Sequence, residues 1–185
     1  MKRVSVKIPA AAMLTHFTRA SKTASALDNL IAILKCGTIR GGRRMVGGGR
    51  AAVCLFDVPI AELGALLDRR NRRRYEPFGI AIDKRYAFKT GARPVIYLPA
   101  IEARQILDEE ERWRVVTIDL NGAPPIDWTF EREWRLAGDL VFEPNEAAAL
   151  VESWKDVDEI FDRFDGRPPC AGVIPIGEIF APRNA

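Results

Sequence analysis

The stretch LTHFTRASKTASALDNLIAILKCG, residues 14–37, contains the strongest structural signals in the chain. Polar and apolar side chains alternate at its start, which predicts a short strand over residues 10–18. Ser25 then precedes an apolar pattern, and Asp28 follows three residues later, a variant of the capping box that begins a helix. Leucine and isoleucine recur at helical spacing until Gly37, a natural C-terminal stop. This stretch therefore predicts a strand followed by an amphipathic helix.

Further strand and helix patterns alternate along the rest of the chain. Glycine and arginine make residues 40–50 a flexible basic loop. Without a repeat or a low-complexity linker, we expect one domain over residues 1–185, of the α+β class. Strands are expected at 51–56, 78–82, 94–98, 115–120, 128–137 and 171–176, with 140–142 extending or pairing with the strand before it, and helices after Asp57-Val58-Pro59, at 99–112 and at 145–164.

Composition excludes several classes of protein. The 185 residues contain three widely spaced cysteines, which disfavours a zinc site or a disulfide framework. His16 is the only histidine, so no mechanism can use two imidazoles. The sequence lacks a nucleophile elbow, a Walker loop and a dinucleotide-binding glycine motif. No apolar run approaches the roughly 20 residues of a membrane span, so we expect no membrane association and a cytoplasmic location.

Charge is unevenly distributed along the chain. Residues 1–93 hold 19 Lys and Arg against 6 Asp and Glu, whereas residues 94–165 hold 7 against 18. Most of the basic residues are arginine, which suits forked contacts with phosphate and stacking on bases. The densest cluster is either the solvated end of a helix or a phosphate-binding surface for nucleic acid. It consists of Arg69, Arg70, Arg72, Arg73 and Arg74.

The segment WTFEREWR, residues 128–135, carries the acids most suited to chemistry. In a strand, Glu131, Glu133 and Arg135 share one face. Two carboxylates so close repel each other, and Arg135 would hold them ionised. Such a pair suits the stabilisation of a cationic sugar centre and hydrogen bonds to ribose hydroxyls. The alternative is a solvent-facing ladder of salt bridges, which contributes little energy.

Together these segments resemble ADP-ribosyltransferase-like bacterial toxins and abortive-infection proteins. The resemblance lies in the order of four motifs: a strand histidine in THFT, a helix LDNLIAILKCG, the segment CLFDVP at residues 54–59, and the late glutamate strand. It spans about residues 13–142. It implies an ADP-ribosyltransferase-like split mixed β-sheet flanked by helices, and an enzyme that uses NAD as its substrate.

The resemblance also implies roles for individual residues. Glu133 would be the catalytic glutamate at the nicotinamide ribose, and Glu131 would orient or deprotonate the acceptor. His16 would bind the adenosine-side ribose, Thr18 would help to hold the strand on the nicotinamide side, and Arg50 would contact the pyrophosphate. Phe56 stands where these families usually have a tyrosine or a Ser-Thr-Ser segment, and would supply an aromatic face to nicotinamide. A nucleic-acid acceptor, bound through the arginine cluster, and a neutralising antitoxin complete the expected partners.

Three functions remain open at this point. The first is an NAD-dependent ADP-ribosyltransferase, toxin-like or active in phage defence, that modifies nucleic acid or protein. The second is a non-enzymatic nucleic-acid-binding or regulatory module on the same fold, with salt-sensitive binding and no consumption of NAD. The third is a nuclease in which Glu131, Glu133 and Asp127 hold Mg²⁺.

Overall fold

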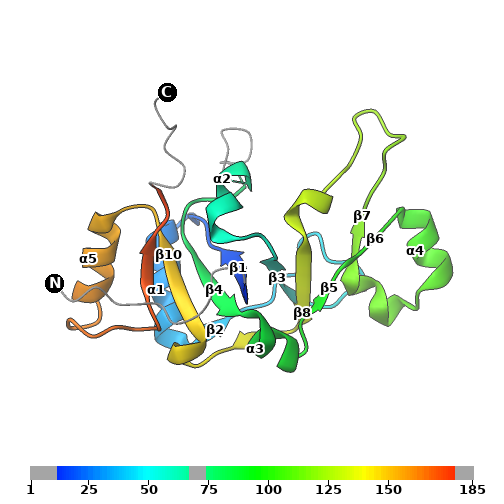
Figure 1. Ribbon diagram of the computed structural model, residues 1–185. Coiled ribbons are helices and arrows are strands. Elements are labelled where there is room, and N and C mark those ends of the chain that lie inside the picture. The colour runs from blue at the N-terminus through cyan, green and yellow to red at the C-terminus, as the bar shows by residue number, and fades with distance from the viewer. Residues whose placement is uncertain (1–11, 67–73, 178–185) are drawn as a thin grey trace.

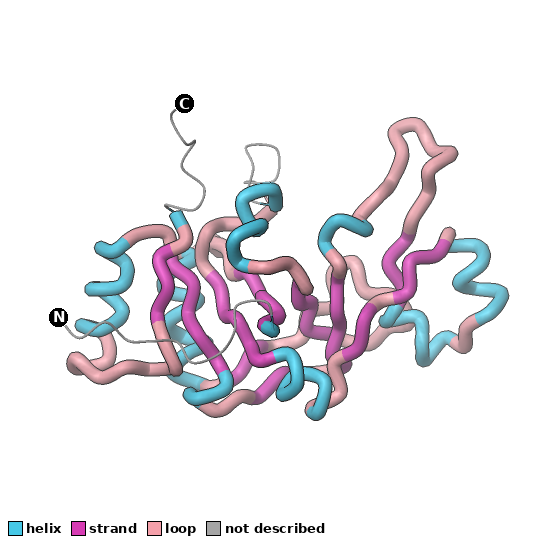
Figure 2. Tube along the Cα trace, in the orientation of Figure 1, coloured by secondary structure: helices cyan, strands magenta, loops and turns pink. Residues whose placement is uncertain are grey.

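A seven-stranded sheet forms the centre of the structure, a computed structural model that describes residues 12–66 and 74–177. Its strand pairs are antiparallel except for the parallel pair of β10 and β11 at one edge. This mixed sheet, with helices around it (Figures 1 and 2), confirms the expected α+β class. In spatial order its strands are β11 (Val173–Pro175), β10 (Ala147–Val151), β4 (Gly79–Asp83), β1 (Met13–Phe17), β3 (Ala52–Phe56), β8 (Glu133–Ala137) and β5 (Arg93–Pro94).

Two hydrophobic cores lie on the two faces of the sheet. One core contains Leu30 of α1 (Ala26–Cys36) and Ile160 of α5 (Trp154–Asp162), both with no exposed surface. The other contains Leu63, at the start of α2 (Leu63–Leu66), which follows the 3₁₀ helix η2 (Ile60–Glu62). Side chains of β4 alternate between the two cores, as the pleat of a strand requires.

The capping box and the glycine stop of the first helix are confirmed. Ser25 Oγ accepts a hydrogen bond from the Asp28 amide at 3.0 Å, and Asp28 Oδ2 accepts one from the Ser25 amide at 3.3 Å. Gly37 ends the helix at φ +61°, in the left-handed region that glycine enters without steric cost. These local signals needed no tertiary partner to be read from the sequence.

A smaller lobe, residues 96–126, lies beyond β8 and β5, at the opposite end of the molecule from α5 (Figure 1). We call it the outer lobe. Its strands β6 (Ile96–Leu98) and β7 (Val115–Thr117) pair in parallel, joined through α4 (Ala100–Ile106) and the 3₁₀ helix η3 (Glu109–Arg114). The single helix expected at 99–112 is therefore wrong. Leu107 is extended, and three glutamates fall in the first turn of η3, where the helix dipole favours acidic side chains.

The helix expected at 145–164 is wrong in its first half. Ala147–Val151 is instead β10, a strand without exposed surface between β4 and β11. Its alternate residues belong to the two different cores. A strand buried on both faces reads as a continuous apolar run, and tertiary pairing here overrides the helical preference of alanine. The helix α5 begins only at Trp154.

Smaller differences concern the connections. Leu140–Val141 (β9) pairs with Thr38–Ile39 (β2), not with β8. The helix α3 (Lys84–Lys89), capped by Asp83, was not expected. The 3₁₀ helices η4 (Thr129–Glu131) and η5 (Pro144–Glu146) complete the elements. No helix among the described residues is both long and apolar enough to cross a membrane.

The sheet opens between its two central strands. β1 pairs with β4 over five residues, and β3 pairs with β8 over five, but β1 meets β3 at one pair, Thr15 and Phe56. Beyond that pair, a side chain bridges the two strands: Nδ1 of His16 lies 2.9 Å from the carbonyl oxygen of Cys54. The separation of two well-paired halves agrees with the expected split sheet, and it leaves room for a cavity between them.

Candidate active site

Glu133 and Arg135 form a buried ion pair on β8. As expected for residues two apart in a strand, their side chains share one face, and Arg135 Nε donates to Glu133 Oε1 at 2.7 Å. The exposed fractions of the two side chains are 7% and 4%. This burial excludes the solvent-facing ladder of salt bridges, because an exposed ladder would leave both groups in water.

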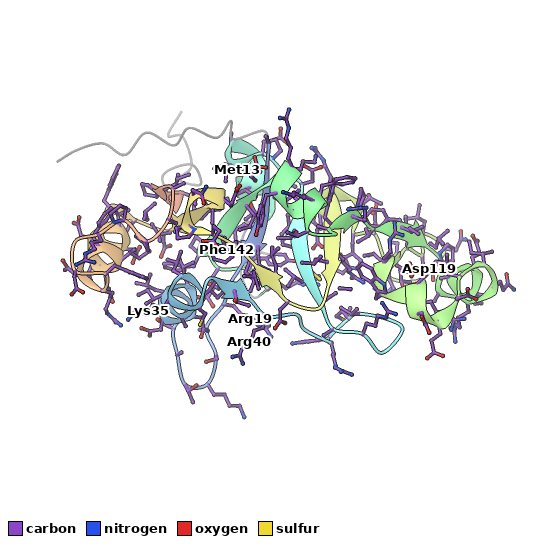
Figure 3. The ribbon with its side chains drawn as sticks, turned by 90° about the horizontal axis from the view of Figure 1, so that it is seen from below. Met13, Arg19, Lys35, Arg40, Asp119 and Phe142 are labelled. Carbon is purple, nitrogen blue, oxygen red and sulfur yellow. The ribbon has the colours of Figure 1, made fainter. Side chains whose placement is uncertain are left out.

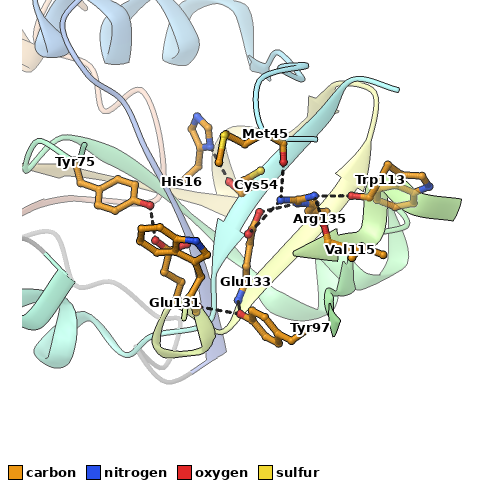
Figure 4. A network of polar contacts seen from close by, with 11 residues as sticks. His16, Met45, Cys54, Tyr75, Tyr97, Trp113, Val115, Glu131, Glu133 and Arg135 are labelled. Atoms are coloured by element: carbon orange, nitrogen blue, oxygen red, sulfur yellow. Dashed lines mark hydrogen bonds and ion pairs between the residues drawn. The ribbon is translucent and has the colours of Figure 1, made fainter. Parts of the chain in front are cut away.

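Arg135 uses all five of its N–H groups. Besides its two bonds to Glu133, it donates to the carbonyls of Trp113 at 2.7 Å, Val115 at 3.0 Å and Met45 at 3.3 Å (Figure 4). Its guanidinium therefore joins β8 to the outer lobe and to the glycine-rich loop. Every N–H donor of Arg135 is therefore occupied within the protein.

Glu131 lies outside the strand, contrary to the expectation for residues 128–137. It ends the 3₁₀ helix η4, and Arg132 follows in the left-handed region at φ +45°. Asp127 Oδ1 accepts hydrogen bonds from the amide and the hydroxyl of Thr129, which stabilises the turn. The strand pattern failed here because these local side-chain bonds compete with the β-ladder, so β8 starts at Glu133.

Glu131 is also buried, but its environment differs from that of Glu133. Its Oε1 accepts a 2.6 Å hydrogen bond from the Tyr75 hydroxyl. Burial raises the pKa of Glu131, the bond from Tyr75 acts against this, and the charge of Glu133 raises the pKa further. Burial and Glu131 in turn raise the pKa of Tyr75. The two acids therefore differ: Glu133 is an ion-paired carboxylate, whereas Glu131 has a raised pKa.

His16 lies where the sheet opens. A carbonyl oxygen only accepts hydrogen bonds, so Nδ1 carries the proton that His16 donates to Cys54. Burial lowers the pKa of His16, and the bond to Cys54 acts against this. Because the net shift is downward, the neutral ring is favoured, and with its proton on Nδ1 its Nε2 is an acceptor.

Three adjoining cavities bring these residues together. The central cavity, about 170 Å³, is lined by His16, Phe56, Tyr75, Glu131 and Glu133 among others. The inner cavity, about 460 Å³, shares His16 and Phe17 with it and extends along α1. The outer cavity, about 510 Å³, shares both glutamates with the central one and extends over the outer lobe. The early histidine and the late acids thus meet in one space.

Thr18 and Phe56 lie beside this space in buried positions. The Thr18 hydroxyl donates to the Ala26 carbonyl at 3.0 Å, which fastens the end of β1 to the start of α1. Thr18 also lines the inner cavity. Phe56 packs edge-on against the ring of Tyr75, with the ring centroids 5.2 Å apart.

The structure places some of the basic residues that the sequence singled out. Arg50 does not line the three cavities and instead pairs with the exposed Glu110 at 3.3 Å. Arg69, Arg70, Arg72 and Arg73 lie outside the described residues, whereas Arg74 stacks its guanidinium 4.0 Å from the ring centre of Trp128. Arg19 and Arg40 both line the inner cavity and are labelled near each other in Figure 3.

Two tyrosines complete the site and were not singled out from the sequence. Tyr75 follows the arginine cluster without any motif around it. Tyr97, in the apolar strand β6, accepts a hydrogen bond from the Glu133 amide at 3.1 Å and donates to the Trp128 carbonyl at 3.3 Å. Neither residue has a spacing signal, because both reach the acids through tertiary contacts.

The acids proposed as magnesium ligands of a nuclease are not arranged around a common point. Within residues 12–66 and 74–177, no group of three or more His, Cys, Asp or Glu side chains is placed to hold a metal ion. Asp127, the third ligand that a nuclease would need, has its carboxylate bound to Thr129. The structure therefore gives no support to a magnesium nuclease at this site.

Comparisons with known proteins found similar structures only. No protein-family model matches the chain, and no curated protein matches it. Solved structures of DarT from Thermus sp. 2.9 are similar to it. The complex with carba-NAD+ is 12% identical, with a TM-score of 0.49 and coverage of 93% of this chain and 99% of that one. The complex with NAD+ is 13% identical, with a TM-score of 0.46 and coverage of 94% of this chain and 100% of that one. The complex with ADP-ribosylated ssDNA is 15% identical, with a TM-score of 0.44 and coverage of 97% of this chain and 100% of that one.

Proposed function

We propose that this protein transfers ADP-ribose from NAD to a nucleic-acid acceptor. The proposal is carried by one observation: His16 and the two buried glutamates line a single cavity at the point where the sheet opens. It agrees with the sequence motifs, in which the same residues stand in the order found in ADP-ribosyltransferase-like toxins.

The inner and central cavities suit the two halves of NAD. The neutral His16 offers Nε2 as an acceptor for a ribose hydroxyl, and Glu133 offers a carboxylate to the other ribose. Arg19 and Arg40 line the inner cavity and are exposed, so they can meet the pyrophosphate without breaking a bond to another described side chain. We assign the pyrophosphate to them in place of Arg50, which is paired with Glu110.

The chemistry depends on charge stabilisation more than on acid catalysis. The glycosidic nitrogen of NAD is already positively charged, so nicotinamide leaves with the electron pair of the carbon–nitrogen bond. Glu133 stabilises the positive charge that develops on the ribose carbon. The acceptor atom supplies a new electron pair to that carbon, and its proton passes to Glu131. The products are nicotinamide and the ADP-ribosylated acceptor.

The outer cavity suits a nucleotide acceptor. Trp128 provides an aromatic surface, and Arg74, Arg104 and Arg112 line the same cavity. Aromatic rings stack on bases, and arginine binds phosphate and stacks on aromatic rings. Its shared wall with the central cavity contains both glutamates, so an acceptor bound there lies next to the proposed donor.

Purified protein incubated with NAD and single-stranded or double-stranded DNA or RNA tests the proposal. We expect free nicotinamide and a mass gain of one ADP-ribose on one of the polymers, both lost in Glu133→Gln. Salt-sensitive binding to a polymer without consumption of NAD would replace the transferase by the binding module. A mass gain on an added protein instead of a polymer would overturn the nucleic-acid acceptor while retaining the transfer.

The biological role that we propose is that of a toxin or a phage-defence effector held in check by a neutralising partner. Modification of cellular nucleic acid by this chemistry would stop growth of the producing cell. Induced expression in a bacterium should therefore arrest growth, and the Glu133→Gln variant at the same protein level should not. Equal growth of both strains would contradict the role.

A further inference from the structure

Tyr75 is held from two sides in the central cavity. Its ring packs against Phe17 and Phe56, with ring centroids 5.9 Å and 5.2 Å away, and the latter contact is edge-on. The hydroxyl at the far end of this wedged ring donates to Glu131 Oε1 at 2.6 Å (Figure 4). Because the aromatic contacts fix the ring, they also fix the place of the hydroxyl.

Glu131 stands on the boundary between two spaces. It lines the central cavity, which we assign to the donor, and the outer cavity, which we assign to the acceptor. Among the described residues, Tyr75 provides the side-chain hydrogen bond that this carboxylate accepts. The bond is made to Oε1, which leaves Oε2 for a group that enters the cavities.

We propose that Tyr75 is the positioning residue for Glu131, fixing its carboxylate at this boundary so that Oε2 takes the proton of the acceptor. The inference rests on the proposed transfer of ADP-ribose and deepens it by dividing the work between the two acids. Glu133 with Arg135 serves the ribose, and Glu131 with Tyr75 serves the acceptor.

The proton balance follows from this division. The bond between the acceptor atom and its hydrogen breaks, and the proton moves to Glu131 Oε2. The electron pair left on the acceptor atom forms the bond to the ribose carbon, as the pair of the former glycosidic bond leaves with nicotinamide. Glu131 must be deprotonated at the start, so transfer falls at low pH with the titration of this carboxyl.

Burial and the neighbouring charges determine whether the pKa of Glu131 is raised or lowered. Burial raises the pKa of Glu131, the Tyr75 bond acts against this, and Glu133 raises the pKa again. Removing the Tyr75 hydroxyl should therefore raise the pKa further, because a buried carboxylate loses its donor. Within residues 12–66 and 74–177, the titratable and charged groups around Glu131 are Tyr75, Glu133, Arg74 and Arg135, and Tyr97 is also affected by its charge.

The variant Tyr75→Phe removes the hydroxyl and keeps the wedged ring. We expect the acid limb of the transfer profile to move to higher pH and kcat at neutral pH to fall about tenfold, less than the 100-fold or more that loss of a general base costs. The Kd for NAD should stay within twofold. Tyr86→Phe is the matched control, because the Tyr86 hydroxyl donates to the distant Val141 carbonyl, and its profile should coincide with that of the wild type.

A direct titration separates this inference from the proposed function. With ¹³C-labelled glutamate carboxyls and the Glu131 signal assigned through Glu131→Gln, NMR should report a higher pKa for Glu131 in Tyr75→Phe than in the wild type. An unchanged pKa or an unmoved acid limb would overturn the positioning role. A raised pKa in a protein that releases no nicotinamide would instead overturn the transferase, and the role of Tyr75 in the transfer with it, leaving only its contact with Glu131.

Discussion

Glu131 and Glu133 are two residues apart, and their buried carboxylates are held by different partners. Tyr75 donates to Glu131 Oε1 at 2.6 Å, whereas Arg135 donates to Glu133 Oε1 at 2.7 Å. The left-handed Arg132 between them separates the 3₁₀ turn from the strand. Two acids that would repel each other on one strand face are thereby given separate chemical environments.

Loss of Arg135 should destabilise the protein strongly. In Arg135→Met, Glu133 is left buried without its partner, and the three carbonyls that Arg135 joins lose a donor. Breaking a buried pair in this way costs about 3–5 kcal/mol. Urea unfolding followed by circular dichroism measures the change.

An exposed arginine of the same segment is the control for this experiment. Arg132 pairs with Glu62 at 3.4 Å, and more than half of each side chain is exposed. Its replacement by methionine should cost less than about 1 kcal/mol. If both variants lost a similar amount of unfolding free energy, the internal bonds of Arg135 would contribute no more to stability than a surface ion pair does.

Replacement of Glu133 by glutamine should separate turnover from binding. The side chain keeps its shape, but it no longer carries the negative charge that opposes the developing charge on ribose. We expect kcat to fall 100-fold or more, about 3 kcal/mol of transition-state stabilisation, with a Kd for NAD within a few-fold of the wild type. Nicotinamide release and equilibrium dialysis give the two quantities, and Glu143→Gln, at an exposed site, should change neither.

Local signals in the sequence predicted local structure well. The capping box at Ser25 and the stop at Gly37 involve residues within one helix, so their interactions are written in the sequence itself. The strand face shared by Glu133 and Arg135 was predicted correctly for the same reason. His16 was placed near the acids only through the resemblance to a family, because nothing local links residues so far apart.

The failures occurred where tertiary contacts decide the outcome. Ala147–Val151 is a strand because β4 and β11 lie on either side of it, which no feature of its alanines reveals. Glu131 leaves the strand because Asp127 stabilises a turn before it. Tyr75 was missed because its contact with Glu131 spans 56 residues of sequence. Distant partners of this kind form much of the site.

The single histidine should titrate below its usual value. Burial lowers the pKa of His16 from 6.5, whereas the unfolded chain keeps the ordinary value. Between the two values the unfolded state binds more protons, so stability rises with pH. The contribution of His16 is therefore present above pH 6.5 and is lost as the pH falls through its folded pKa.

Proton NMR can follow this titration without assignment work, since the chain has one imidazole. We expect a midpoint below 6.5 in the folded protein and close to 6.5 in concentrated urea. In His16→Gln, the part of the pH dependence of unfolding in this window should disappear. A folded-state midpoint at or above 6.5 would be inconsistent with a neutral, half-buried ring at the opening of the sheet.

Glu131 should impose a pH dependence of the opposite sign. Because burial raises its pKa in the folded state, the folded protein binds the proton more tightly than the unfolded chain does. Its contribution to stability is complete below the unfolded value of about 4.5 and is lost as the pH rises through the folded value.

Glu131→Gln stays neutral and can still accept the bond from Tyr75. The free energy of unfolding of the wild type should therefore decline relative to that of this variant as the pH rises. The control is the exposed Glu102→Gln, whose free energy of unfolding should keep a constant difference from that of the wild type over the same pH range. A constant difference for Glu131→Gln from pH 4 to 8 would mean that the carboxylate pays no desolvation cost, and that the buried turn at Glu131 is open to water.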